Sequence, residues 1–142
     1  MIYTPLTKKA LKLCFEAHKE QVDKTGLPYV FHPFHLAEQM DDEISTVCAL
    51  LHDVVEDTEI TLEMLGEMGY PQNVLDVLAL LTHDESVTYM DYVKMISTNP
   101  TATKVKIADL THNSDVTRLD VVDKWAKKRN KKYKKALRIL TK

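Results

Sequence analysis

The sequence predicts a single all-α domain, and three observations lead to this prediction. Apolar residues recur at three- and four-residue spacing through most of the chain, which is the period of amphipathic helices. No stretch alternates apolar and polar residues between hairpin turns, so no strand is expected. Only three Gly and five Pro among 142 residues leave little room for the many turns of a β fold. We expect seven or eight helices in one domain over residues 1–142.

The first two helices are expected on either side of a loop. Apolar residues at i, i+3, i+4 and i+7 from Ala10 form one face of a helix over about residues 7–21, with Thr7 as its N-cap. Gly and Pro mark a loop over residues 23–28. A short helix then begins near Pro33, because proline suits the first positions of a helix.

The next helix begins around Asp42 and carries a run of apolar residues to His52 and Asp53. Adjacent side chains on a regular helix point in different directions. We therefore expect this helix to end at the His-Asp pair, where the chain turns and both side chains can face one point. Further helices are expected over residues 61–68, 73–81 and 89–96, and from Pro100 to beyond Asn113.

A basic helix is expected over about residues 121–141. Its inward side is expected to carry the apolar residues Trp125, Tyr133, Ala136, Leu137 and Leu140. Its many Lys and Arg residues form either a solvated face or a patch that attracts an anionic substrate or contacts nucleic acid, and charge alone does not decide. The formal net charge of −2 argues against a whole molecule built to bind nucleic acid.

Other features indicate a cytoplasmic protein. The N-terminus lacks the charged segment and apolar stretch of a signal peptide, and no apolar run approaches the about 20 residues that span a bilayer. Cys14 and Cys48 lie in apolar helical patterns and are expected to be buried thiols. Neither a membrane nor a nucleic-acid partner is expected, and the choice between a monomer and a homo-oligomer stays open.

The segment over residues 49–58 carries the most informative chemistry. An apolar run leads into His52-Asp53, and Glu56-Asp57 follow one turn later. Ionisable pairs beside an apolar run would be costly if they were buried without partners, and a bound metal ion removes that cost. Imidazole and carboxylate groups without thiolates favour Mn, Fe, Co or Zn in a site other than a structural zinc finger.

Two further ligands are expected from distant parts of the chain. His32 lies where a loop meets a helix, and Asp109 lies within a later helix. On that helix Lys106, Asp109 and Asn113 are three and four residues apart, so they share one face. Such a stripe is typical of a phosphate contact, a metal ligand and a hydrogen-bonding group.

These segments resemble a known family. The pattern His…His-Asp…Asp is the signature of the HD superfamily of metal-dependent phosphohydrolases. Three strings resemble the hydrolase domain of RelA/SpoT proteins in order and spacing, over about residues 8–120: GLPYVFHP (26–33), LLHDVVEDT (50–58), and VKIAD (105–109) with Asn113. Since the chain stops at Lys142, we expect a small stand-alone hydrolase domain of the metazoan SpoT homologue type.

The resemblance implies a helical bundle around one divalent ion, with Mn²⁺ expected. It implies hydrolysis of guanosine tetra- and pentaphosphate alarmones, (p)ppGpp, in which a metal-bound water releases pyrophosphate from the 3′ position. Four side chains would bind the metal by matching position: His32, His52, Asp53 and Asp109. Two would orient and deprotonate the water: Glu56 and Asp57. Four would contact the nucleotide, two at phosphate and two at the sugar and neighbouring groups: Lys24 and Lys106, then Tyr29 and Asn113.

One position departs from the family pattern. The family often has a basic residue just before the lysine of the loop, where it can stack on guanine, and this chain has Asp23 there. A carboxylate cannot stack as a cation, and it repels a polyphosphate. Two alternatives therefore stand beside the alarmone hydrolase: a phosphohydrolase for another nucleotide such as NADPH, and a non-catalytic nucleotide-binding module. The presence of Glu56 and Asp57 argues against the module.

The remaining histidines are given no ligand role. His35 and His112 are close enough in sequence to His32 and Asp109 to lie near the site. We expect His83, which precedes an acidic loop, to be exposed.

Overall fold

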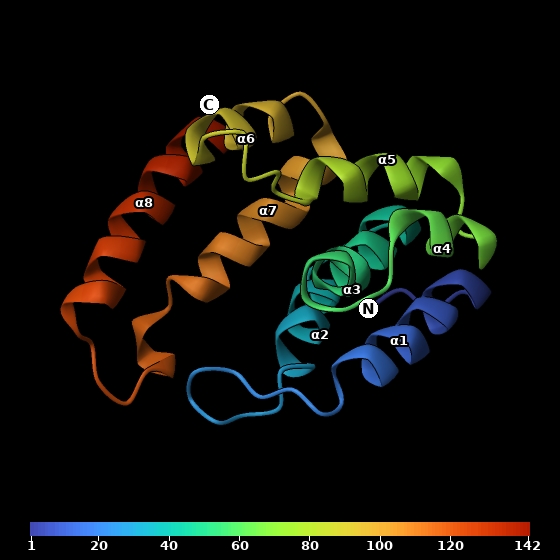
Figure 1. Cartoon of the computed structure of the whole chain (residues 1–142), viewed down its shortest axis with the longest axis horizontal. Coiled ribbons are helices and arrows are strands. Elements are labelled where there is room, and N and C mark those ends of the chain that lie inside the picture. Colours follow the sequence, from blue (N-terminus) through green and yellow to red (C-terminus); the bar gives the residue numbers. More distant parts are fainter.

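The computed structural model describes residues 1–142 and confirms the all-α prediction (Figure 1). It contains eight α-helices, one short 3-10 helix and no strand, with a single isolated bridge between Val22 and Pro28. The elements in order are α1 (Pro5–His18), α2 (Phe31–Glu38), α3 (Glu43–Asp57), α4 (Leu62–Glu67), α5 (Gln72–Leu81), α6 (Tyr89–Ile96), α7 (Pro100–Asn113), η1 (Val116–Arg118) and α8 (Lys124–Leu140).

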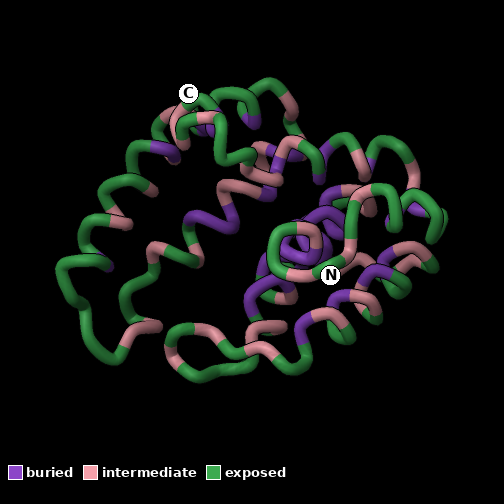
Figure 2. Tube along the Cα trace, viewed as in Figure 1, coloured by how far each residue is buried: buried purple, intermediate pink, exposed green.

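Helix α3 lies at the centre of the molecule, and α1, α2, α5 and α7 pack around it (Figure 1). All ten residues from Ser45 to Val54 are buried, and purple gathers at the position of α3 in Figure 2, where the helix is seen nearly end-on. A helix that is buried on all sides forms the centre of a core. Twenty-six buried apolar residues form one cluster, to which α3 contributes several members, and His52 and Asp53 are buried on the same helix.

Side-chain caps fix where several helices begin. Asp42 and Thr61 accept hydrogen bonds at the N-caps of α3 and α4, as the sequence predicts. The predicted start of α1 was wrong, because Thr4 is its N-cap and Thr7 is its third residue. The Thr7 hydroxyl instead pairs with the Thr4 backbone N–H, at 2.7 Å. Both threonines thus form a capping box, and each satisfies a backbone donor of the first turn.

The predicted end of α3 was also wrong. The helix continues past His52 and Asp53 to Asp57, yet Nε2 of His52 and Oδ2 of Asp53 lie 3.0 Å apart. Adjacent helical positions differ by about 100°, and the long imidazole and the carboxylate both reach the space between them. No turn of the chain is needed to bring this pair to one point.

Helix α8 packs against α6 and α7 at the edge of the molecule (Figure 1). It begins three residues later than predicted, because Asp123 caps the first turn by accepting a hydrogen bond from the Ala126 N–H, at 2.9 Å. Ala126 takes the inward position, and the neighbouring Trp125 side chain is 60% exposed. The prediction that Trp125 packs inward was therefore wrong, whereas the other four predicted inward residues are buried or packed against the core.

Both cysteines are buried and unpaired, as predicted. Burial raises the pKa of the Cys14 and Cys48 thiols to about 12, so both side chains stay uncharged and fill space in the core. No helix in the structure combines the length and the apolar composition that crossing a bilayer demands.

Candidate metal centre

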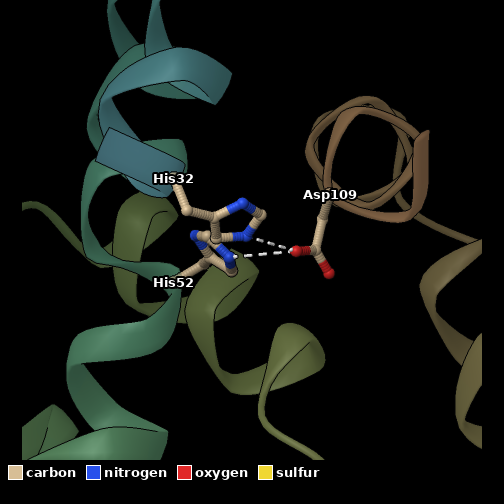
Figure 3. Close-up of side chains that lie close together, drawn as sticks. All are labelled: His32, His52 and Asp109. Carbon is tan, nitrogen blue, oxygen red and sulfur yellow. Dashed lines mark hydrogen bonds and ion pairs between the residues drawn. The ribbon is translucent and has the colours of Figure 1, made fainter. Parts of the chain in front are cut away.

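Three helices bring His32, His52 and Asp109 to one point in the interior. His32 belongs to α2, His52 to α3 and Asp109 to α7, and Figure 3 shows both imidazoles directed at the carboxylate. The Nε2 atoms of His32 and His52 lie 2.8 and 3.5 Å from Oδ1 of Asp109. All three residues are buried, and one ligand atom from each lies within 4.8 Å of the others.

The backbone of α3 fixes the orientation of His52. Its Nδ1–H donates to the Ala49 carbonyl, at 2.7 Å, which leaves Nε2 as the free nitrogen. This Nε2 atom is buried and makes no hydrogen bond of good geometry, although carboxylate oxygens of Asp53 and Asp109 lie 3.0 and 3.5 Å from it. A buried polar atom without a partner is costly, and a metal ion is a partner that a neutral imidazole nitrogen can accept.

Asp53, the fourth predicted ligand, lies beside the other three. Its Oδ2 atom is 3.0 Å from Nε2 of His52 and 3.8 Å from Nε2 of His32. The same oxygen accepts a hydrogen bond from the Tyr29 hydroxyl. Tyr29, which the sequence placed at the nucleotide, thus holds a ligand with its hydroxyl, while the residue also lines the neighbouring cavity.

Burial and charge oppose each other at these groups. Burial lowers the pKa of His52, but the carboxylates of Asp53 and Asp109 raise it well above its ordinary value. Burial raises the pKa of Asp109, but Lys106 and the two imidazoles bring it well below its ordinary value. The centre thus keeps its carboxylates ionised and favours a positive charge between them and the imidazoles.

This donor set fits a divalent metal ion. Two imidazole nitrogens and two carboxylate oxygens, with no thiolate among them, are ligands that Mn, Fe, Co and Zn accept. The unpaired Nε2 atom of His52 and the two ionised carboxylates are what such an ion would satisfy. When bound, the ion would replace the charge that the metal-free centre takes up as protons.

Lys106 and Asn113 hold the Asp109 carboxylate. Lys106 Nζ lies 2.9 Å from Oδ2, and Asn113 Nδ2 donates to Oδ1 at 3.0 Å. The predicted stripe along α7 is therefore present, and its outer members contact the predicted ligand. Lys106 is nearly buried between Asp109 and the Tyr92 ring, 5.4 Å from the ring centroid. Asn113 also reaches the cavity beside the centre.

Glu56 and Asp57 lie in the last turn of α3, one turn beyond the ligands, and both are exposed. Partial burial of the Asp57 carboxyl raises its pKa, and repulsion from the Asp53 carboxylate raises it further. Burial likewise raises the pKa of Glu56, whose Oε1 accepts a hydrogen bond from the His83 backbone N–H at 2.7 Å. His83 is partly buried in making this contact, so the expectation that it is exposed was wrong.

His112 is a supporting residue that the sequence did not assign. Its Nδ1 lies 2.6 Å from Nδ1 of His32, and the two rings are nearly parallel with centroids 4.9 Å apart. The His35 ring also contacts His112, with centroids 4.3 Å apart. Burial, with the positive charge of Arg118, lowers the pKa of His112 to about 4. The sequence feature that could have indicated this role is the position of His112 three residues after Asp109, on the same face of α7.

A cavity of about 330 Å³ adjoins the centre. Its lining includes Tyr29, His32 and Asn113 at the centre, together with three cationic residues from separate segments, Lys24, Arg118 and Arg129. Asp23 and Asp115 also line it, so the cavity joins the cluster of ligands to a second region that carries three cations and two carboxylates. A space of this size and composition suits a small polar molecule with more than one anionic group.

Asp23 does not present a free negative charge to this cavity. Its Oδ1 accepts hydrogen bonds from the Thr25 N–H, the Thr25 hydroxyl and the Leu27 N–H, at 2.8, 2.7 and 3.1 Å. Its Oδ2 lies 3.6 Å from an Arg118 guanidinium nitrogen. Arg118 also donates to the His112 carbonyl, at 2.8 Å. Asp23 therefore orders the loop and positions an arginine.

Known proteins of similar sequence include bacterial and animal relatives. A probable GTP pyrophosphokinase of Mycobacterium leprae is 32% identical over 135 residues, covering 87% of this chain and 17% of that protein. A guanosine-3′,5′-bis(diphosphate) 3′-pyrophosphohydrolase of Aquifex aeolicus is 31% identical over 118 residues, covering 75% of this chain and 17% of that protein. The Xenopus tropicalis protein named guanosine-3′,5′-bis(diphosphate) 3′-pyrophosphohydrolase MESH1 is 28% identical over 141 residues, covering 90% of this chain and 78% of that protein.

The fold is shared with a solved structure described as a metazoan ortholog of SpoT that hydrolyzes ppGpp. The two superpose with a TM-score of 0.74 and 23% identity, covering 99% of this chain and 85% of the other. No protein-family model matches the chain. The chain spans less than a fifth of the two bacterial relatives and most of the Xenopus protein.

Proposed function

Because this chain belongs to the RelA/SpoT-like proteins of the HD superfamily, we propose that it is a metal-dependent hydrolase that releases pyrophosphate from the 3′ position of a (p)ppGpp-type alarmone. The observation that carries the proposal is the convergence of His32, His52, Asp53 and Asp109 beside a polar cavity. The Xenopus relative, of which this chain covers 78%, bears the name of that activity. The cavity offers room and charge for a nucleotide.

His32, His52, Asp53 and Asp109 would hold the ion, and Mn²⁺ is the ion we propose. When bound, such an ion acidifies a water molecule and neutralises charge on phosphoryl oxygens. Lys106 keeps Asp109 ionised and aimed at the centre through its 2.9 Å contact. The Tyr29 hydroxyl holds Asp53 in position by donating a hydrogen bond to its Oδ2 atom. These contacts fix the ligand geometry before the substrate enters.

Glu56 and Asp57 would orient the attacking water and take its proton. Burial raises the pKa of both carboxyls, which makes them better proton acceptors than ordinary carboxylates. The water oxygen bonds to the phosphorus next to the 3′ oxygen. The bond between this phosphorus and the 3′ oxygen breaks, and the proton from the water ends on the 3′ oxygen as a hydroxyl. The far end of the nucleotide would lie against Lys24, Arg118 and Arg129.

The direct test is turnover of guanosine tetraphosphate by the purified protein with Mn²⁺, with pyrophosphate measured as product. Asp53→Asn should lower the rate by at least about 1,000-fold, since it removes a ligand charge from the centre. Asp91→Asn, at an exposed position of α6, is the matched control and should leave the rate unchanged. Binding of the nucleotide without any product would point to a non-catalytic module and reject the proposal.

A second candidate, hydrolysis of another nucleotide such as NADPH, is favoured by Asp23. This residue takes the place of a base-stacking cation, and its carboxylate is used within the loop and on Arg118. A panel of nucleotides, scored separately for phosphate and pyrophosphate, separates the two candidates. Faster turnover of a nucleotide without guanine would favour the second, and activity confined to guanine alarmones would reject it.

A further inference from the structure

Helix α8 has a charge composition unlike the rest of the molecule. It contains nine of the 19 Lys and Arg residues and none of the 21 Asp and Glu residues. The remaining chain, with ten cations against 21 anions, has a formal charge of −11. The net charge of −2 therefore conceals a strongly basic helix on an acidic body.

These cationic side chains form no hydrogen bond within the molecule, and one of them, Lys132, lies over the Tyr89 ring of α6, 4.5 Å from its centroid. Arg129 lines the cavity beside the metal centre, and the other eight are exposed. None of the nine forms an ion pair, although Lys19, Lys104, Lys106 and Arg118 elsewhere all do. Like charges at i and i+4, such as Lys127 and Lys131, destabilise a helix. The sequence therefore retains an unfavourable arrangement that a polyanion would relieve.

The only tryptophan of the chain lies beside two of these cations. Trp125 is 60% exposed, and the ammonium groups of Lys124 and Lys128 lie 5.6 and 5.9 Å from its ring centroid. A large flat ring between two cations offers a surface on which a base can stack while the lysines contact the adjoining phosphates. An aromatic ring of this kind is not needed to attract a small anion.

We propose that the outer face of α8, defined by its exposed Lys residues and Trp125, binds single-stranded nucleic acid. The helix is about 25 Å long, which is enough to follow several nucleotides of a strand. Figure 2 shows it exposed along the outer edge of the molecule. The proposal does not depend on the hydrolase activity, because the face lies apart from the metal ligands.

An anionic membrane is a less suitable partner. A helix that lies on a bilayer inserts a free apolar stripe, whereas the apolar stripe of α8 packs against α6 and α7. Ala126, Ala136 and Leu140 are buried there. What α8 offers outward is charge and one aromatic ring.

The experiment uses the full protein and an oligonucleotide of about 20 deoxythymidines as probe. Binding should quench the Trp125 fluorescence, which reports from this face alone because the chain has one tryptophan. If about four phosphates are contacted, raising the salt from about 50 to 200 mM should weaken binding about 50-fold. Unchanged fluorescence and no shift in the anisotropy of a labelled probe would overturn the proposal.

Matched variants locate the contact. Replacing Lys124, Lys128 and Lys135, which are exposed on the side of α8 that carries Trp125, by Gln should lower the log–log salt slope by about 2. Replacing Lys8, Lys12 and Lys94, which are also exposed and unpaired, by Gln gives the same net charge and should change nothing. If the two triple variants weaken binding equally, binding depends only on the net charge of the protein, and the assignment to α8 is overturned.

Trp125 is tested with a labelled probe. Trp125→Ala should weaken binding about 10-fold, and Trp125→Phe should restore most of it. Equal binding of a duplex of the same length would contradict base stacking and overturn the single-strand assignment. Tighter binding to vesicles of anionic phospholipid would do the same in favour of a membrane. A fall in nucleotide turnover in the α8 triple variant, without oligonucleotide binding, would show that the face only attracts substrate.

Discussion

His112 controls the position of a predicted metal ligand without belonging to the ligand set. Its ring nitrogen contacts the nitrogen of His32 that faces away from the centre, and its lowered pKa keeps it neutral at pH 7. A neutral partner fixes the tautomer of His32 without adding positive charge beside the ion. His112 is therefore a positioning residue.

We expect His112→Ala to weaken Mn²⁺ affinity by about 10- to 100-fold, because His32 loses the contact that orients it. The measurement is calorimetric titration of the purified protein with Mn²⁺. His112→Asn, which can still hydrogen-bond, should recover part of the affinity. Thr111→Ala, at the exposed neighbouring position, is the control. Equal affinity in His112→Ala and the native protein would contradict this role.

Arg118 gives a prediction about substrate binding. Its guanidinium lines the cavity and is held by Asp23 and by the His112 carbonyl. Arg118→Ala should raise KM about 10-fold with little change in kcat, since it removes a charged contact that substrate and transition state share. Arg138→Ala, on α8 outside the cavity lining, should leave KM unchanged. A fall in kcat alone would place Arg118 in the chemical step instead.

The residues of the centre were predictable from the sequence, but their supports were not. Two adjacent ionisable residues after an apolar run, and a charged stripe on one helix face, leave few arrangements other than a metal site. Supports such as His112 and Tyr29 act through contacts between segments that the chain separates by 80 and 24 residues. Spacing along one element carries no information about such pairs.

Among the elements, α3 and α8 differ most in how much of the helix surface is buried. Helix α3 is buried around most of its circumference and forms the base of the centre, whereas α8 is attached by one stripe to α6 and α7. The stability of α8 therefore depends on its own composition more than that of α3 does. Repulsion among its lysines is the largest unfavourable feature of that composition.

Lys131→Glu should stabilise the protein by about 0.5–1 kcal/mol, because it turns two repulsive i,i+4 pairs, with Lys127 and Lys135, into attractive ones. Urea unfolding at low salt measures the change. Lys131→Gln should give about half the effect. The gain should shrink as salt is added, because surface charges are screened. A loss of stability in Lys131→Glu at low salt would contradict this account of α8.

At the scale of the whole molecule, the centre links helices that are far apart in the sequence. Its members come from α2, α3 and α7, which a bound ion would tie together. Anything that binds only the folded state stabilises it. The stability of the fold should therefore depend on metal and on pH together.

In the metal-free protein we expect stability to fall as pH rises from about 6 to 8. The pKa of His52 is higher in the folded state than its unfolded value of about 6.5. Its stabilising contribution is therefore complete below that value and is lost as pH rises through the folded pKa. Saturating Mn²⁺ should reverse the trend, because the ion competes better with protons at higher pH.

Urea midpoints at about pH 6 and 8, with chelator or with Mn²⁺, check this expectation. The lowered pKa values of Asp53 and Asp109 act in a lower window, where the carboxylates protonate, and do not affect the comparison. The same pH trend with and without metal would show that the centre does not govern stability.

The fold class and nearly all the helices could be predicted, because the apolar period and the caps are local signals. Errors arose where two signals overlapped. Thr4 and Thr7 both resemble caps, and the capping box uses both. The predicted end of α3 is too early, because the imidazole and carboxylate side chains are long enough to meet from adjacent helical positions. Hydrophobicity predicts an inward Trp125, but Ala126 occupies that position.

The division of charge described for α8 also determines how copies of the protein meet. A body of −11 carrying a helix of +9 has a large electric dipole despite its small net charge. At low ionic strength, where the Debye length is about 30 Å at 0.01 M, the helix of one molecule is drawn to the body of the next. Ion-exchange matrices of either sign should then retain the protein, each through a different side of the molecule.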